Sequence, residues 1–129
     1  YIKKKLYKFF KLFPFLKNKS ADFTILLTNS NKMKSLNKKF RYKNKATDVL
    51  SFPFYLKKNL RKIKNKKIYL GDIAISYEIV NSRSKLTNFN LEFDKVWVHG
   101  LLHLLGYNHV KNTDYIQMYK VEKKIINSI

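Results

Sequence analysis

All three histidines of this 129-residue chain fall within eleven consecutive residues, His99-Gly-Leu-Leu-His-Leu-Leu-Gly-Tyr-Asn-His109. His99 and His103 are four residues apart, so on a helix they project from the same face, one turn apart. Gly106 follows three residues later, and glycine is the usual residue where a helix ends in a left-handed turn. Such a turn brings His109 back toward the other two. Three imidazoles without a fourth protein ligand are typical of catalytic zinc, which keeps one position for water or substrate.

The histidines lie in a segment that is apolar on nearly every side of the expected helix. Its apolar members are Val96, Trp97, Val98, Leu101, Leu102, Leu104 and Leu105. A helix of this kind should be buried. Two buried histidines without partners would leave polar nitrogens unsatisfied, at about 1–3 kcal/mol each, and a metal ion removes that penalty. We therefore predict one Zn²⁺ per chain, bound by His99, His103 and His109, rather than a purely structural trio.

The spacing is similar to the metzincin protease pattern H-E-x-x-H-x-x-G-x-x-H, but the glutamate general base is missing. Gly100 stands in its place. The ligand positions therefore favour zinc, whereas the missing carboxylate argues against ordinary peptide hydrolysis. A zinc peptidase or another metal hydrolase is kept as an alternative function.

The formal net charge is +20, which favours an anionic partner such as RNA. Because 25 lysines accompany only three arginines, part of this charge reflects composition, and the rare arginines Arg41, Arg61 and Arg83 are more informative. Residues 57–67 contain seven basic residues and no acidic one. This segment is expected to be an exposed loop or hairpin that either grips phosphates or is a solvated run of charge. The candidate RNA contacts are Arg41, Lys57, Lys58, Arg61 and Lys62.

The length predicts a single domain, and no apolar run is long enough to span a bilayer. The absence of cysteine excludes disulfides and a thiolate metal site. Strands are predicted over residues 23–28, 49–54 and 68–75, with Gly71 marking a bulge or a close backbone approach in the third. The first helix should cover residues 1–13 and end at Pro14, and it either packs on the core, the expected role, or lies on a membrane surface. The chain begins at Tyr1 rather than methionine, which leaves open whether its N-terminus is complete.

Capping residues predict where the other four helices begin. Asn29 should cap a helix that runs to about residue 40, and Ser76 one that runs to about residue 84. Asn90 should cap the helix that carries the first two histidines. Thr113 should cap the last helix, which runs nearly to the end of the chain.

Glu122 lies in the middle of the apolar face of the last helix. That face is formed by Tyr115, Met118, Tyr119, Ile125, Ile126 and Ile129. A carboxylate in such a position needs a partner. Glu122 either orients a ligand histidine through its free ring nitrogen or pairs with a lysine or a backbone amide. Asp48, Asp72 and Glu122 are the candidate general bases, although Asp48 and Asp72 are more typical of turn and strand-end structure.

Four sequence blocks, in order, resemble the YbeY endoribonuclease family of bacterial and organellar rRNA maturation factors. The histidine segment resembles its H-G-x-L-H-L-x-G-Y-D-H signature. The other three blocks are Leu36-Asn37 with Phe40-Arg41 and Thr47-Asp-Val-Leu-Ser-Phe-Pro53, then Leu70-Gly-Asp-Ile-Ala-Ile-Ser76, then Met118 with Glu122. The resemblance runs from about residue 21 to residue 129. The chain departs from the family at Asn108, where aspartate is usual, and in the strongly basic segment 57–67.

The resemblance implies an α+β, zincin-like single domain in which a small mixed sheet packs against about five helices. It also implies a zinc-dependent, single-strand-specific endoribonuclease. Such an enzyme would act in the cytoplasm, in maturation of the 3′ end of small-subunit rRNA and in ribosome quality control. Its partners would be single-stranded or ribosomal RNA and the small ribosomal subunit.

The resemblance further implies that Arg41 and His99 are catalytic, and a guanidinium suits this role because it holds phosphate oxygens in a bidentate fork. Asn108 and Glu122 are the candidates for support behind the metal ligands. A non-catalytic ribosome- or RNA-binding factor with a zinc site is a further alternative. A three-ligand site disfavours it, because structural zinc is usually fully coordinated by protein.

Overall fold

A three-stranded sheet in the order β1-β3-β2 lies at the centre of the structure, a computed structural model that describes residues 1–129. The strands are β1 (Ser20–Thr28), β2 (Val49–Pro53) and β3 (Lys67–Ser76). β1 runs parallel to β3, and β2 runs antiparallel to it. The predicted small mixed sheet and the α+β fold class are therefore confirmed. β1 begins three residues earlier than expected because Ser20 pairs with Lys67.

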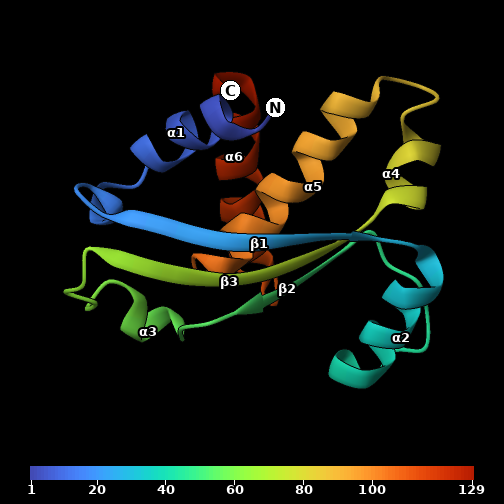
Figure 1. Cartoon of the computed structure of the whole chain (residues 1–129), viewed down its shortest axis with the longest axis horizontal. Helices are drawn as coiled ribbons and strands as arrows, with labels where there is room; N and C mark the ends of the chain where they lie inside the picture. The colour runs from blue at the N-terminus through green and yellow to red at the C-terminus, as the bar shows by residue number, and fades with distance from the viewer.

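Helices α1 (Lys3–Lys11), α5 (Phe89–Leu104) and α6 (Asn112–Ser128) pack with one face of the sheet around the main core (Figure 1). Ten of the 16 residues of α5 are buried, as its apolar sequence predicted. α2 (Ser30–Arg41) packs on the other face, where Met33 meets Leu50 and Ala74. α4 (Tyr77–Arg83) connects β3 to the segment before α5. None of the helices has the length and hydrophobicity needed to span a bilayer.

The basic segment 57–67 is not the plain loop or hairpin that the sequence suggested. It begins with one helical turn, α3 (Lys57–Leu60), which raises the number of α-helices from the expected five to six. Leu60 is buried in the main core and anchors the turn, while the lysines remain exposed. α3 and α2 lie near opposite ends of the strands (Figure 1). At the N-terminus, α1 already ends at Lys11, and Pro14 opens a short 3₁₀ turn.

Two helix caps differ from the prediction. Asn88, not Asn90, caps α5, and its side chain accepts a hydrogen bond from the Leu91 N–H at 2.9 Å. α6 begins at Asn112, so Thr113 lies inside its first turn and no side chain caps it. The first error arises because Asn88 and Asn90 are both able to cap and stand close together. The second arises because α6 begins after Lys111, whose side chain makes no capping bond. The caps at Asn29 and Ser76 are confirmed.

Gly71 on β3 lies very close to the backbone of β2. Its φ is +136°, and a Cβ added there would lie 2.3 Å from the Phe52 carbonyl oxygen. The register between β1 and β3 shifts at the same point, between the pairs Asp22–Tyr69 and Thr24–Asp72. The expected bulge and close approach are therefore both present.

Gly71→Ala is expected to destabilise the protein by about 2–4 kcal/mol, because it combines a strained φ with a steric overlap against backbone. Urea unfolding followed by circular dichroism measures the loss. Exposed Ala46 offers a matched control, since Ala46→Gly changes the same methyl group outside any helix or strand. A Gly71→Ala protein as stable as the parent would contradict the close approach.

Candidate metal centre

The three histidines meet where α5 ends, as their spacing predicted. One nitrogen from each ring lies within 4.8 Å of the corresponding nitrogens of the other two. His99 Nε2 and His103 Nε2 are 3.1 Å apart, and the His109 ring centroid lies 4.9 Å from that of His103. Gly106 makes the turn that returns His109, with φ +98° and Lys57 packed so closely that a Cβ would lie 2.6 Å from its Cγ. This is a compact group that fits a metal ion.

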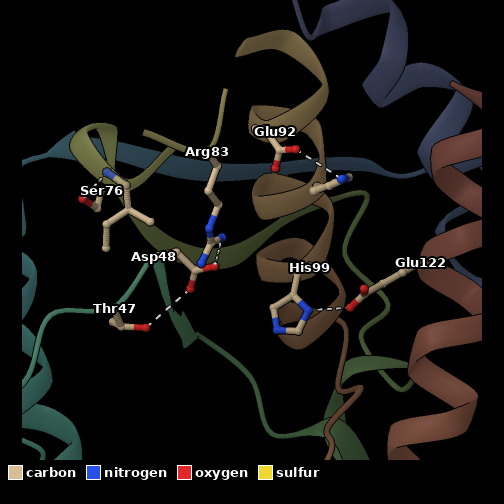
Figure 2. A network of polar contacts seen from close by, with 9 residues as sticks. Thr47, Asp48, Ser76, Arg83, Glu92, His99 and Glu122 are labelled. Carbon is tan, nitrogen blue, oxygen red and sulfur yellow. Dashed lines mark hydrogen bonds and ion pairs between the residues drawn. The ribbon is translucent and has the colours of Figure 1, made fainter. Parts of the chain in front are cut away.

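The hydrogen bonds behind the rings determine which nitrogens are free. His99 Nδ1 contacts the Glu122 carboxylate (Figure 2), and His103 Nδ1 lies 2.8 Å from the Tyr107 carbonyl oxygen. Because both oxygens accept, each Nδ1 carries the proton and each Nε2 keeps its lone pair. The two lone pairs then face one another across 3.1 Å and repel unless a cation lies between them. The donor set therefore suits a divalent ion with borderline-soft character such as zinc.

Burial lowers the pKa of His103 to about 4, and the neighbouring His99 adds to the effect. His103 is therefore neutral at neutral pH and able to bind a metal ion. The unfolded chain takes up the same proton at the ordinary histidine pKa of about 6.5. Between these two pKa values the folded state binds fewer protons than the unfolded state, so acid favours unfolding.

The metal-free protein is therefore expected to keep the stability that neutral His103 contributes above pH 6.5. It should lose this stability progressively as the pH falls toward 4. Urea unfolding at several pH values would measure the loss, with His103→Asn as the comparison because its amide nitrogen stands in for Nδ1 as the donor to the Tyr107 carbonyl but does not titrate. The parent should lose more stability than this variant over that range. Parallel curves would show that His103 is not a buried neutral imidazole.

Glu122 reaches the site from α6. Of the two partners that its sequence position allowed, the structure brings it to a ligand histidine. The tyrosines of the same helix were expected on its apolar face, but Tyr115 is 58% exposed and Tyr119 is 54% exposed. They line a small cavity of about 120 Å³ behind His99 and His109. The inward face of α6 is thus narrower than its sequence suggested, because Met118 between the two tyrosines is buried in the main core while both tyrosines are exposed.

A larger cavity of about 800 Å³ opens on the other side of the histidines. It lies between β2, the end of α2 and the 43–48 segment, and Arg41, Lys43 and Lys45 line it. Arg41 Nη2 donates to the Ser51 carbonyl at 2.9 Å, which leaves the other N–H groups of the guanidinium for a ligand. The cavity therefore combines the histidine group with three positive charges.

Two polar side chains that the sequence analysis did not single out hold this cavity together. Asn37 is buried, and its side-chain amide donates to the Lys45 carbonyl at 2.9 Å, which holds the 43–48 segment in place. Ser51 Oγ donates to the Gly100 carbonyl at 2.9 Å and ties β2 to α5. Ser51 had one signal, a polar residue within an apolar strand, and both residues stand in the sequence blocks that resemble the YbeY family.

Gly100 occupies the position of the metzincin glutamate for a packing reason. A Cβ added there would lie 2.8 Å from Ile73 Cγ2 and 3.2 Å from Val49 Cγ2. This side of α5 lies directly on the sheet and leaves no room for a side chain. A carboxylate cannot be placed here without separating α5 from the sheet.

The carboxylates considered as general bases lie in different places. Asp48 lines the large cavity and forms a 2.7 Å ion pair with Arg83 (Figure 2). Asp72 accepts a hydrogen bond from the Tyr69 hydroxyl on the opposite face of the sheet, away from the histidines. Glu122 is engaged with His99. Asp48 is therefore the only one of these three that lines the large cavity.

The other predicted residues are only partly brought together. Asn108 lines the large cavity, and its Oδ1 accepts a hydrogen bond from the Val110 N–H at 3.3 Å. Lys57 lies against Gly106. Lys58 and Lys62 are exposed on and just after α3. Arg61 is not at the cavity, because its guanidinium lies over the Phe15 ring, 5.0 Å from the centroid, beside a different pocket.

Known proteins share this sequence over most of its length. The sequence matches the family model described as endoribonuclease YbeY over residues 2–129. A relative from Pelagibacter ubique, named endoribonuclease YbeY, is 46% identical over 125 residues, which are 95% of this chain and 78% of the relative. The chain belongs to the endoribonuclease YbeY family. The family match begins at residue 2, earlier than the four sequence blocks indicated.

Other matches are consistent with YbeY family membership. A relative from Buchnera aphidicola, also named endoribonuclease YbeY, is 42% identical over 107 residues, and the alignment covers 81% of this chain and 66% of the relative. A solution structure from Thermotoga maritima superposes with a TM-score of 0.62 at 24% identity. That comparison covers 98% of this chain and 79% of the other, and it supports the fold.

Proposed function

We propose that this protein is a zinc-dependent endoribonuclease that cuts single-stranded RNA. One observation carries the proposal: three imidazoles converge beside a cavity of about 800 Å³ that Arg41, Lys43 and Lys45 make positive. Relatives named endoribonuclease YbeY point to the same reaction. A phosphodiester is the substrate that needs both a metal ion and cations around a developing negative charge.

His99, His103 and His109 would hold the ion. When bound, zinc polarises a phosphoryl oxygen and lowers the pKa of coordinated water toward 7. Glu122 fixes the proton on His99 Nδ1, so that Nε2 faces the ion. Asn108 supports the turn that returns His109, through its hydrogen bond to the Val110 N–H.

The guanidinium of Arg41 binds the non-bridging oxygens of the scissile phosphate in this proposal. Its N–H groups form a rigid fork that fits two phosphate oxygens, and its hydrogen bond to the Ser51 carbonyl orients it. Lys43 and Lys45 neutralise flanking phosphates. Asp48 is the best-placed proton acceptor of the three candidate carboxylates, since it lines the cavity and Arg83 holds it there.

We further propose that the RNA is ribosomal, at the 3′ end of the small-subunit rRNA, and that the protein acts with the small ribosomal subunit in the cytoplasm and in ribosome quality control. The net charge of +20 supports a polyanionic partner of this kind. A zinc peptidase is disfavoured, because packing against Ile73 excludes a glutamate at position 100.

Removal of the metal is expected to abolish RNA cleavage while leaving RNA binding largely intact, because arginine and lysine supply the phosphate contacts. The test uses a labelled, unstructured RNA with zinc-loaded protein, chelated protein, and chelated protein to which zinc is restored. Casein is the control substrate. Equal cleavage before and after chelation would contradict the proposal, and zinc-dependent cleavage of casein would revive the peptidase.

A further inference from the structure

Four aromatic side chains form a row on the face of the sheet opposite the main core. The Phe40 and Phe52 ring centroids lie 5.2 Å apart at an interplanar angle of 71°, and those of Phe54 and Tyr69 lie 5.9 Å apart at 81°. Only Pro53 separates Phe52 from Phe54 along the chain. We call Phe40, Phe52, Phe54 and Tyr69 the aromatic row.

The aromatic row is open to solvent. Phe54 is 64% exposed and Phe40 is 50% exposed, while Phe52 and Tyr69 are half-buried beneath them. α2 covers part of this face, where Met33 meets Leu50 and Ala74 and where Leu36 and Phe52 pack around them. α2, which carries Phe40 near its end, and α3 lie toward opposite ends of the strands (Figure 1). Clustered exposed aromatic rings mark an interaction surface rather than a core.

The aromatic row adjoins the large cavity at two points. Phe40 directly precedes Arg41, and Phe54 directly follows Pro53, and both Arg41 and Pro53 line the cavity. Phe40 and Phe54 are thus chain neighbours of two cavity residues, at the edge strand β2. An RNA strand with one phosphate at Arg41 that turns around this edge would meet the row.

The charges beside the aromatic row favour a nucleic acid over an apolar protein partner. Lys39 Nζ lies 5.3 Å from the Phe40 ring centroid, and Lys43 and Lys45 line the adjoining cavity. At the far end, Asp72 accepts the hydrogen bond of the Tyr69 hydroxyl, and its carboxylate would repel a phosphate. This polarity places phosphates on the lysine side and uncharged bases over the rings.

We propose that the aromatic row stacks the unpaired bases that flank the cut site of single-stranded RNA, chiefly on Phe40 and Phe54. Every base has a π-face, so stacking on exposed rings holds a strand without reading its sequence. Paired bases are already stacked within a duplex and cannot use the row, which gives a physical basis for single-strand preference. The inference deepens the proposed function and rests on it for the identity of the strand.

Binding of a fluorescein-labelled, unstructured 12-nucleotide RNA to the chelated protein tests this inference by fluorescence anisotropy at fixed salt. Phe40→Leu and Phe54→Leu are each expected to weaken binding about 5-fold or more, as stacking losses of this kind do. Phe54→Trp should keep the parental affinity because it keeps a ring. Tyr7→Leu is the matched control, since Tyr7 is also 64% exposed and also has a lysine over its ring, but lies on α1.

A base analogue whose fluorescence falls on stacking, 2-aminopurine beside the cut site, reports the contact directly. Its emission should fall with the parent and with Phe54→Trp, and much less with Phe54→Leu. Unchanged affinity and emission in both leucine variants, or equal weakening in Tyr7→Leu, would overturn the inference. An RNA that binds through the row but is never cut would overturn the proposed nuclease function alone. Cleavage with no dependence on the row would overturn this inference alone.

Discussion

His103→Ala is expected to abolish stoichiometric zinc binding and, with it, RNA cleavage. The variant leaves two imidazoles where three converge, and it removes the ligand that the Tyr107 carbonyl holds in orientation. Loss of a residue that merely supports a metal ligand already costs about 10–100-fold in affinity, so loss of a ligand should cost more than 100-fold. Elemental analysis of purified, untagged protein and calorimetric zinc titration measure the change.

The control for this experiment is His103→Asn, whose amide nitrogen stands in for Nδ1 as the donor to the Tyr107 carbonyl and which fills more of the space than alanine. Circular dichroism establishes that each variant is folded before its metal content is compared. Both variants should lack zinc although they are folded. One equivalent of zinc retained by folded His103→Ala would show that the ion is bound elsewhere, and the proposed metal centre would then be wrong.

Arg41→Ala is expected to slow cleavage of single-stranded RNA by about 10²–10³-fold at saturating zinc, the usual cost of removing one donor to a developing negative charge. Zinc content should not change, because the guanidinium is not a ligand. Arg41→Lys should recover only part of the rate, since an ammonium keeps the charge but not the bidentate fork. Single-turnover cleavage separates this loss from a loss of binding.

Arg61→Ala is the matched control for that series. Arg61 is also an exposed arginine, but it lies over Phe15 and away from the cavity, so its removal should leave the rate within about twofold of the parent. An Arg41→Ala protein that cuts at the parental rate would contradict the assignment of the phosphate contact. Equal losses in both arginine variants would show that general charge, rather than the fork of Arg41, governs the rate.

The local parts of this structure could be predicted from sequence because short-range geometry determines them. A spacing of four places His99 and His103 on one helical face, and a glycine three residues later allows the turn that returns His109. The glycine at position 71 likewise predicted a bulge in its strand, since few other residues tolerate a backbone conformation with positive φ. Where local signals were redundant, as with Asn88 and Asn90, the prediction of the cap was wrong.

The sequence by itself determined that the three histidine rings converge, because all three lie within eleven consecutive residues that form a helix end and the turn after it. Only the tertiary structure decided what surrounds them. Glu122 meets His99 across two packed helices, Arg41 reaches the cavity from a helix that ends beside β2, and Ile73 forbids a side chain at Gly100. These contacts join residues far apart in the chain, so they depend on how whole elements pack, and no spacing within a single element encodes that.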